Sequence, residues 1–217
     1  MNLDEVQFEQ KDINWGPYIM HCRLPQYMID NLIAGGDVLD TDFRDQLAGH
    51  LKVERAYNEA QCEWFYNEML PIWNEYRLRH YNYHGFGKYD VPESPVAIKG
   101  TQLWINYMTK GEANPPHTHS GDLSFVIYCQ IPEGMTDLHG IKPNSAPPGS
   151  IIFQHGVVNR PQWSMTERYF TPEVGDMFIF PALQSHMVLP FRCDGVRISV
   201  SGNLIYTNRD EWPSYFF

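Results

Sequence analysis

The sequence predicts a mainly β protein of the α+β class, in which an N-terminal helical layer supports a C-terminal double-sheet β-roll. Two changes of texture along the chain carry this prediction. In residues 26–33 and about 54–80 apolar side chains recur every three or four positions, which is the period of amphipathic helices. From residue 96 onward short apolar runs alternate with Pro and Gly, as in a sandwich, jelly roll or barrel.

The composition is that of a packed globular chain. Its 217 residues are 43% hydrophobic and 19% charged, and a β-rich chain of this length commonly forms one undivided unit. We therefore expect a single domain over 1–217, with helical support in 1–95, a β-roll core in 96–207 and a tail in 208–217. The net charge of −10 argues against nucleic acid as a partner, because phosphate backbones are bound by clustered Lys and Arg.

The sequence shows no feature of a secreted or membrane-inserted chain. It contains no run of 18 apolar residues, and its first residues lack the basic and apolar segments of a secretory signal. We therefore expect a cytoplasmic protein without a membrane partner. Four scattered cysteines without C-x-x-C spacing predict core thiols, not disulfides or a cysteine zinc site. They are Cys22, Cys62, Cys129 and Cys193.

The N-terminal part predicts one edge strand and two helical segments. Residues 12–24 have the pattern of an edge strand interrupted by a Gly-Pro pair. Residues 26–33 have helical spacing, and Gly35-Gly36 is expected to end that helix. Residues 54–80 predict the longest helix of the chain, which Pro71 should kink or divide in two.

The C-terminal part predicts seven short strands separated by turns. Their number and density favour two packed sheets or a barrel. The predicted strands are 101–109, 122–131, 149–154, 163–170, 175–180, 186–190 and 196–206.

A polar, proline-stiffened turn precedes the second of these strands and contains His117 and His119. Side chains alternate in extended backbone, so residues at i and i+2 point to the same face. Imidazole is a common metal ligand, but histidines also occur in solvated turns. The pair alone therefore predicts a metal site only weakly.

Two residues far downstream strengthen that prediction. His186 follows a turn, an apolar strand and a proline-led bend, and Arg197 lies on the polar face of the last strand beside Ser199. A β-roll would place that strand centrally, where a guanidinium needs a carboxylate partner. A pocket for a dicarboxylate would provide one.

Together these segments resemble the iron(II)- and 2-oxoglutarate-dependent oxygenase superfamily, and look most like its prolyl-hydroxylase-like branch in bacteria and bacteriophages. The resemblance covers about residues 100–206. It rests on Trp104–Tyr107, on His117 to Tyr128, on Gly175 to His186 and on Arg197–Ser199. It implies a double-stranded β-helix, or jelly roll, that uses iron(II), 2-oxoglutarate (2OG) and O2. The expected reaction hydroxylates an unidentified organic substrate and releases succinate and carbon dioxide.

The resemblance also implies roles for individual residues. The first metal-binding histidine falls on His117 and the distal one on His186, and no catalytic side chain is implied beyond the metal centre. The cosubstrate-binding candidates are Arg197, Ser199, Tyr128, Tyr107 and Asn106.

One position departs from the family pattern. The usual carboxylate two residues after the first histidine is replaced by His119. Either His119 is the third ligand, or Asp122 supplies a carboxylate from the turn. We favour His119 because Asp122 would need a non-strand backbone to converge on the metal. As a third alternative, His119 only orients a ligand through a hydrogen bond.

Two rival functions are compatible with the same residues. A cupin-like three-histidine metalloenzyme would not use 2OG and would have no need of Arg197. A binding or structural jelly roll would keep its histidines on the surface and hold no metal. The sequence does not identify the substrate, for which a prolyl peptide and a small molecule both fit, and it leaves room for a homo-oligomer.

Overall fold

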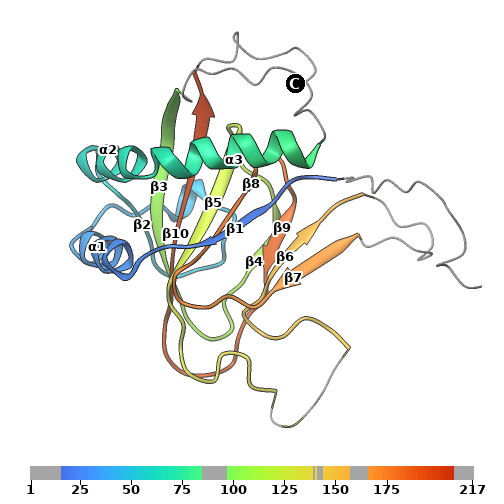
Figure 1. Cartoon of the computed structure of the whole chain (residues 1–217). Coiled ribbons are helices and arrows are strands. Elements are labelled where there is room, and N and C mark those ends of the chain that lie inside the picture. The colour runs from blue at the N-terminus through green and yellow to red at the C-terminus, as the bar shows by residue number, and fades with distance from the viewer. Residues whose placement is uncertain (1–15, 85–96, 139, 141–143, 157–165, 208–217) are drawn as a thin grey trace, which may run out of the picture.

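The computed structural model describes residues 16–84, 97–138, 140, 144–156 and 166–207. It has two antiparallel sheets and three helices (Figure 1). The strands are β1 (Met20–Arg23), β2 (Glu54–Ala56), β3 (Ile98–Met108), β4 (Asn114–His117), β5 (Leu123–Gln130), β6 (Ile151–Gln154), β7 (Glu167–Phe170), β8 (Asp176–Pro181), β9 (His186–Val188) and β10 (Arg197–Tyr206). The helices are α1 (Gln26–Asp37), α2 (Glu59–Glu68) and α3 (Leu70–Tyr83), with a short 3₁₀ turn at Arg44–Gln46. The predicted mainly β fold is confirmed.

The six-stranded sheet has the order β1-β8-β5-β10-β3-β2, and the four-stranded sheet has the order β4-β9-β6-β7. Strand β10 is hydrogen-bonded to β3 on one side and to β5 on the other. The last long strand therefore lies centrally, as expected for a β-roll. Its polar residues face the space between the two sheets, where the site described below lies.

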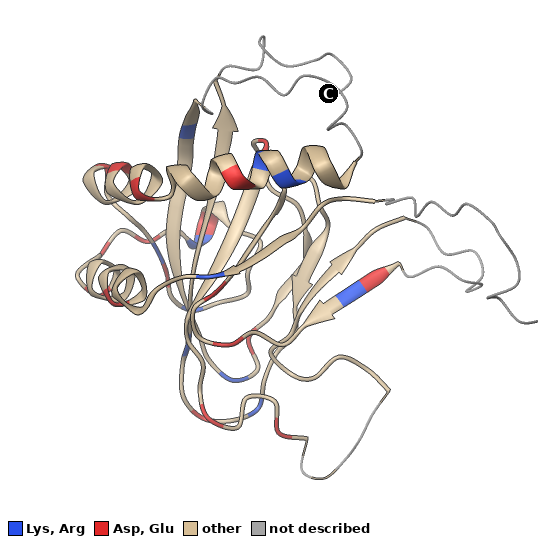
Figure 2. Cartoon of the chain, in the orientation of Figure 1, with Lys and Arg blue, Asp and Glu red and all other residues tan. Residues whose placement is uncertain are grey.

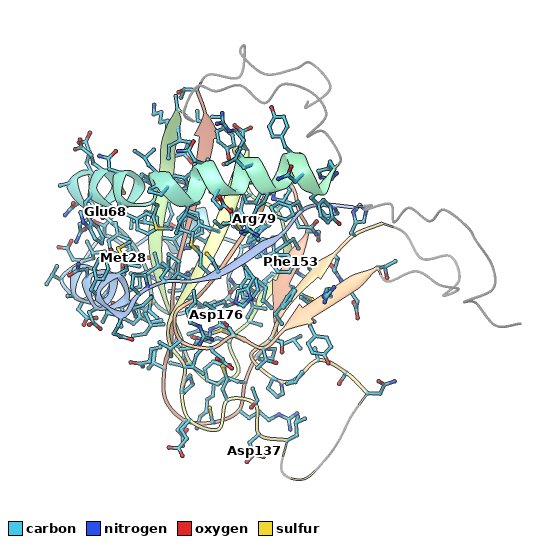
Figure 3. All side chains as sticks on the ribbon, viewed as in Figure 1. Met28, Glu68, Arg79, Asp137, Phe153 and Asp176 are labelled. Atoms are coloured by element: carbon cyan, nitrogen blue, oxygen red, sulfur yellow. The ribbon has the colours of Figure 1, made fainter. Side chains whose placement is uncertain are left out.

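The three helices cover the other face of the six-stranded sheet (Figure 1). Met28 of α1 and Trp73 of α3 belong to the apolar cluster on this face, and the Phe65 ring of α2 stacks on Phe125 with centroids 5.4 Å apart. Phe153 of β6 belongs to a second cluster, which joins the two sheets (Figure 3). The helical layer thus closes one face and leaves the inter-sheet face for the site.

The helix predicted over 54–80 is wrong at its start and right about its division at Pro71. Residues 54–56 form β2, and α2 begins after Asn58, whose side chain forms a reciprocal capping box with Gln61. Pro71 lies in the first turn of α3, where its missing N–H costs nothing, so it divides the predicted helix as expected.

Helix α1 does not end at the glycine pair but continues to Asp37. The reason lies in packing. A Cβ at Gly36 would fall 2.4 Å from Cδ1 of Ile105, so the missing side chain allows the helix to approach β3 closely.

The proline-stiffened segment predicted as a turn is in part a strand. β4 forms the edge of the four-stranded sheet, where two prolines are tolerated because no partner is needed on the outer side. The predicted strand at 12–24 begins at Met20 in the described chain. Residues 12–15 and the tail 208–217 lie outside the described residues.

Charged side chains of both signs are spread over the fold (Figure 2). The helices α1 and α2 carry acidic residues, whereas α3 and β7 each carry both acidic and basic residues. Within the described ranges, no helix is both long and apolar enough to cross a lipid bilayer.

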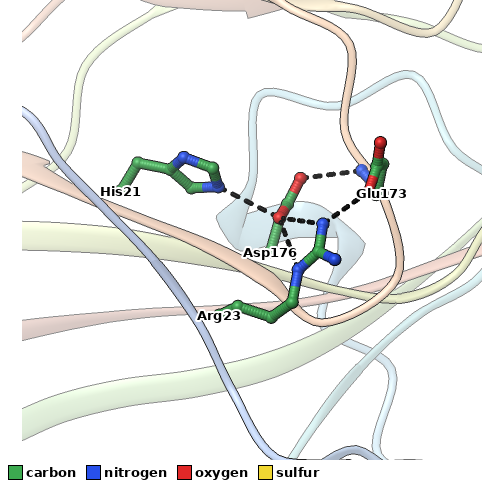
Figure 4. A network of polar contacts seen from close by, with 4 residues as sticks. All are labelled: His21, Arg23, Glu173 and Asp176. Carbon is green, nitrogen blue, oxygen red and sulfur yellow. Dashed lines mark hydrogen bonds and ion pairs between the residues drawn. The ribbon is translucent and has the colours of Figure 1, made fainter.

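A polar network fixes the edge strand β1 to β8 (Figure 4). The buried carboxylate of Asp176 accepts hydrogen bonds from the Glu173 amide at 2.8 Å and from Arg23 Nη2 at 3.1 Å, and lies 3.0 Å from His21 Nε2. Burial alone would raise the pKa of Asp176, but these hydrogen bonds together hold it below its usual value. The ionised carboxylate therefore stabilises the fold.

We expect Asp176→Asn to lower the free energy of unfolding by about 1–3 kcal/mol at pH 7, because the donors around this buried position lose their charged acceptor. A depressed folded-state pKa contributes stability above the unfolded-state pKa and loses it as pH falls through the folded value. The deficit should therefore shrink toward pH 3 in urea titrations. Asp40→Asn, at an exposed position, is the control. A deficit of equal size at both pH values would contradict this account.

Candidate metal centre

Three imidazoles meet between the two sheets. His117 ends β4 and His186 begins β9, and the two residues are direct partners in the strand register. His119 lies just beyond β4, where its amide donates to the Ala182 carbonyl at 2.8 Å. One ring nitrogen from each histidine lies within 4.8 Å of the other two, and the Nε2 atoms of His119 and His186 are 3.3 Å apart. The sequence-predicted histidines are thus brought together.

Backbone carbonyls orient two of the three rings. Nδ1 of His117 lies 2.7 Å from the Pro115 carbonyl oxygen, and Nδ1 of His186 lies 2.9 Å from that of Gln184. A carbonyl oxygen only accepts hydrogen bonds, so each Nδ1 carries the proton and each Nε2 keeps its lone pair. This is the arrangement by which proteins present imidazoles to a metal ion.

The environment keeps all three rings neutral near pH 7. Burial, helped by the neighbouring His186 and His117, lowers the pKa of His119 to about 3. Burial also lowers the pKa of His186 to about 4, and it lowers the pKa of His117 as well. Metal ions bind the neutral imidazole, so no proton has to be displaced from these three nitrogens at neutral pH.

A buried cation lies in the same cavity as the histidines. Arg197 is 2% exposed, and within the described chain no carboxylate forms an ion pair with it. Its Nη1 donates to the Gly149 carbonyl at 3.3 Å, and its Nε has no acceptor among the described residues. Burial lowers the pKa of Arg197, yet a guanidinium stays protonated in proteins. The cavity therefore contains an uncompensated positive charge.

Tyr128 lies beside this cation. The Arg197 guanidinium carbon is 5.6 Å from the centre of the Tyr128 ring. The Tyr128 hydroxyl is buried without a hydrogen-bond partner in the part of the chain described here. Burial raises the pKa of Tyr128 to about 12, although the nearby Arg197 moderates this rise. The hydroxyl therefore keeps its proton and can donate a hydrogen bond to an anion.

Four polar residues form one row across the six-stranded sheet. Ser199 of β10 is in register with Tyr128 of β5 on one side and with Asn106 of β3 on the other, and Asn106 is in register with Glu54 of β2. Directly opposed residues share a face. All four line the cavity.

The cavity measures about 90 Å³, several times the ~10–15 Å³ that a single water needs. It has histidines on the four-stranded sheet and the arginine on the six-stranded sheet. Apolar side chains complete its wall and exclude water from the charged groups. They include Ile151, Phe180 and Val188.

One predicted cosubstrate residue lies elsewhere. Tyr107 follows Asn106 on β3 and points to the opposite face of the sheet, where its hydroxyl donates to Asp37 of α1 at 2.9 Å. It is not among the residues that line the cavity. Tyr107 therefore does not line this cavity together with Asn106, because successive strand residues face opposite sides.

The alternative carboxylate ligand also lies away from the three histidines. Asp122 Oδ2 accepts a hydrogen bond from the Tyr206 amide at 2.7 Å, and the Asp122 amide donates to Leu204. Asp122 therefore ties the start of β5 to β10. The three-histidine group does not include it.

Sequence reasoning missed Glu54, a buried cavity residue. The run around it was assigned to the start of a long helix, whereas the structure forms a strand whose register places Glu54 opposite Asn106. A single acidic residue in a three-residue strand has no periodic signal, so only the tertiary pairing reveals it. Burial, with repulsion from Glu112 and Asp42, raises the pKa of Glu54 to about 7.

The residues present fit a metal ion and a carboxylate together. Three neutral imidazoles offer nitrogen ligands to one point, and an unpaired guanidinium with a neighbouring phenol offers charge and hydrogen bonds to an anion. The site thus has the features of a mononuclear metalloenzyme, on a double-sheet β scaffold, that binds an anionic cosubstrate.

Comparisons with known proteins show which family the β-rich part of the chain is similar to. The family model described as "Putative 2OG-Fe(II) oxygenase" matches residues 102–203, a stretch that contains the three histidines and Arg197. Over this stretch the chain is similar to the 2OG-Fe(II) oxygenases. No curated protein matches the sequence significantly.

Solved structures share the fold at low sequence identity. A viral collagen prolyl hydroxylase from Paramecium bursaria Chlorella virus-1, in complex with 2OG, is 12% identical with a TM-score of 0.53, covering 87% of this chain and 96% of its own. Iron-bound HygX from Streptomyces hygroscopicus is 12% identical with a TM-score of 0.52, covering 92% and 86%. A 2OG-Fe(II) oxygenase family oxidoreductase from Burkholderia pseudomallei is 15% identical with a TM-score of 0.50, covering 85% and 83%.

We expect Glu54→Gln to stabilise the metal-free protein by about 1–3 kcal/mol at pH 8 and by much less at pH 4. The folded-state pKa of Glu54 is raised, so its contribution to stability is present below the unfolded-state pKa and is lost as pH rises through about 7. The amide does not ionise and avoids this loss.

Urea titrations at the two pH values measure the difference in free energy of unfolding between wild type and variant. The histidines titrate in both proteins, so their contribution cancels in this difference. Glu133→Gln, at an exposed position, is the matched control. A wild-type protein as stable as the variant at pH 8 would show that the Glu54 carboxylate is solvated or paired.

Proposed function

We propose that His117, His119 and His186 hold one iron(II) through their Nε2 atoms and that Arg197 binds the 5-carboxylate of 2OG in the adjoining cavity. The observation that carries this proposal is the buried guanidinium, which forms no ion pair in the described part of the chain and lines the same cavity as three convergent imidazoles. A dianionic cosubstrate supplies the missing carboxylate, and charge-assisted hydrogen bonds make its binding favourable.

In this proposal the chain positions and shields the reactants. The Tyr128 hydroxyl donates a hydrogen bond to the same carboxylate that Arg197 binds. Ser199 and the amide of Asn106 border this carboxylate. The apolar wall keeps water from the anion. Carbonyl oxygens of Pro115 and Gln184 fix two ligand rings. No side chain is required as a general base.

Iron(II) with 2OG and O2, when bound, supplies oxidative decarboxylation to succinate and carbon dioxide coupled to hydroxylation of a C–H bond. We propose a hydroxylase whose substrate is a prolyl peptide or a small molecule. A cupin-like enzyme is the second candidate, but it would leave Arg197 buried without a purpose. Cytoplasmic location, the absence of nucleic-acid and membrane partners, and a homo-oligomer stay predictions from the sequence.

Arg197→Ala should weaken 2OG binding to the iron(II) form by about 2 kcal/mol or more, while iron binding is unchanged, because a buried charge-assisted pair is lost. Anaerobic titration with 2OG, followed by the visible charge-transfer band of the chelate, measures the affinity. Arg192→Ala removes an exposed guanidinium from the segment between β9 and β10 and serves as the control. Equal affinities in wild type and Arg197→Ala would reject the assigned role.

His186→Ala and His119→Ala should each lose iron, measured by metal analysis after dialysis, whereas His155→Ala outside the triad should retain it. His119→Asp should also retain iron, because two histidines and one carboxylate form an established iron(II) ligand set. Full iron occupancy in His119→Ala would show that His119 orients a ligand and does not bind the metal.

A further inference from the structure

The row of polar residues across the six-stranded sheet has two unlike ends. Tyr128 adjoins the Arg197 cation on the central strands. Glu54 lies at the other end, on the edge strand β2. The first end offers donors to an anion, and the second offers acceptors. The proposed function uses the first end and leaves the second without a role.

Three oxygens at the second end are buried acceptors without donors. Glu54 Oε2, Asn106 Oδ1 and Asn114 Oδ1 have no hydrogen-bond partner within the described residues. Glu54 is 2% exposed and Asn106 is 4% exposed, and all three residues line the cavity. Asn106 Nδ2 lies 3.4 Å from the Ser199 hydroxyl oxygen, which leaves its Oδ1 as the free atom. Unsatisfied buried acceptors are costly, so a donor-rich ligand is expected there.

Gly49 lets two of these side chains lie close to the backbone of the cavity wall. A Cβ at Gly49 would lie 2.9 Å from Asn114 Oδ1, from Glu54 Oε1 and from Leu51 Cδ1, so any larger residue would displace these side chains. The Gly49 backbone is outside the left-handed region, so conformation does not require glycine here. We refer to the part of the cavity that is lined by Gly49, Glu54 and Asn114 as the recess.

Charge favours a cation over a neutral donor in this recess. No cationic side chain pairs with Glu54 in the described chain. The nearby Arg44 is already engaged by Asp42, with three contacts between 2.6 and 3.0 Å. Glu112 and Asp42 add negative potential, which opposes ionisation of Glu54 until a cation arrives.

We propose that Glu54, Asn106 and Asn114, around the recess at Gly49, bind a protonated amino group of the substrate. The enzyme then acts on an amine-bearing molecule, whose C–H bond is presented to the metal from the acceptor end of the cavity. This inference rests on the proposed function, because it assigns the substrate of the same site. The Glu54 carboxylate supplies the counter-ion, and the two amide oxygens accept the remaining ammonium protons.

The test compares two small probes of equal length, butylammonium and 1-butanol. The protein is loaded with zinc(II) and 2OG, and binding of each probe is measured by ligand-observed NMR. We expect wild type to bind butylammonium about ten- to a hundredfold more tightly than 1-butanol, as for a hydrogen-bonded buried charge. Glu54→Gln should abolish this preference. Glu133→Gln should retain it.

Gly49→Ala provides a second variant that keeps every charge. Its methyl group should displace the Glu54 and Asn114 side chains from their positions against the backbone and weaken butylammonium binding about tenfold, with 2OG affinity unchanged. Equal binding of the two probes to wild type, with 2OG bound normally, would overturn the inference but leave the proposed function intact. Failure of wild type to bind 2OG would instead reject the proposed function. A preference that survives in Glu54→Gln would also overturn the inference.

Discussion

The burial of Arg197 without a carboxylate partner among the described residues is the constraint on which the rest of the site depends. Placing an unpaired charge in a protein interior costs several kcal/mol unless a ligand or solvent compensates it. Arg197 begins β10, where it is in register with Met108 of β3, and the next residue, Ile198, is paired with both β3 and β5, so the backbone at Arg197 is held in place by the sheet. The central sheet therefore maintains a cation that only an incoming anion satisfies.

The histidine group obeys a complementary constraint from the other sheet. β4 and β9 pair so that His117 and His186 are direct neighbours, and carbonyl oxygens fix their ring orientation. Burial keeps the imidazoles neutral, and a metal ion compensates for their desolvation. One sheet thus supplies nitrogen ligands and the other supplies a positive charge, and both groups line the same cavity. A chelating anion that reaches both satisfies them together.

Much of this arrangement could be predicted from local pattern. The alternation along β10 placed Arg197 and Ser199 on one face, and the i, i+2 spacing placed two imidazoles together. Asn106 and Tyr107 could not be separated in this way, because adjacent polar residues on a strand are equally plausible on either face. Only the register, which sets Ser199 opposite Asn106, decides between them. Glu54 was missed for a related reason, since its three-residue strand depends entirely on pairing with β3.

The division of the row between central and edge strands has a functional consequence. Residues on β10 and β5 cannot move without disturbing the core on both faces, so they suit a cosubstrate that is bound in one fixed way. Glu54 lies on a short edge strand, and Gly49 lies in the connection before it, where changes disturb fewer neighbours. If anion binding were on the edge and amine binding in the centre, a change of substrate would require repacking of the sheet. In the proposed arrangement, the order of the strands would let the substrate end vary while the cosubstrate end stays fixed.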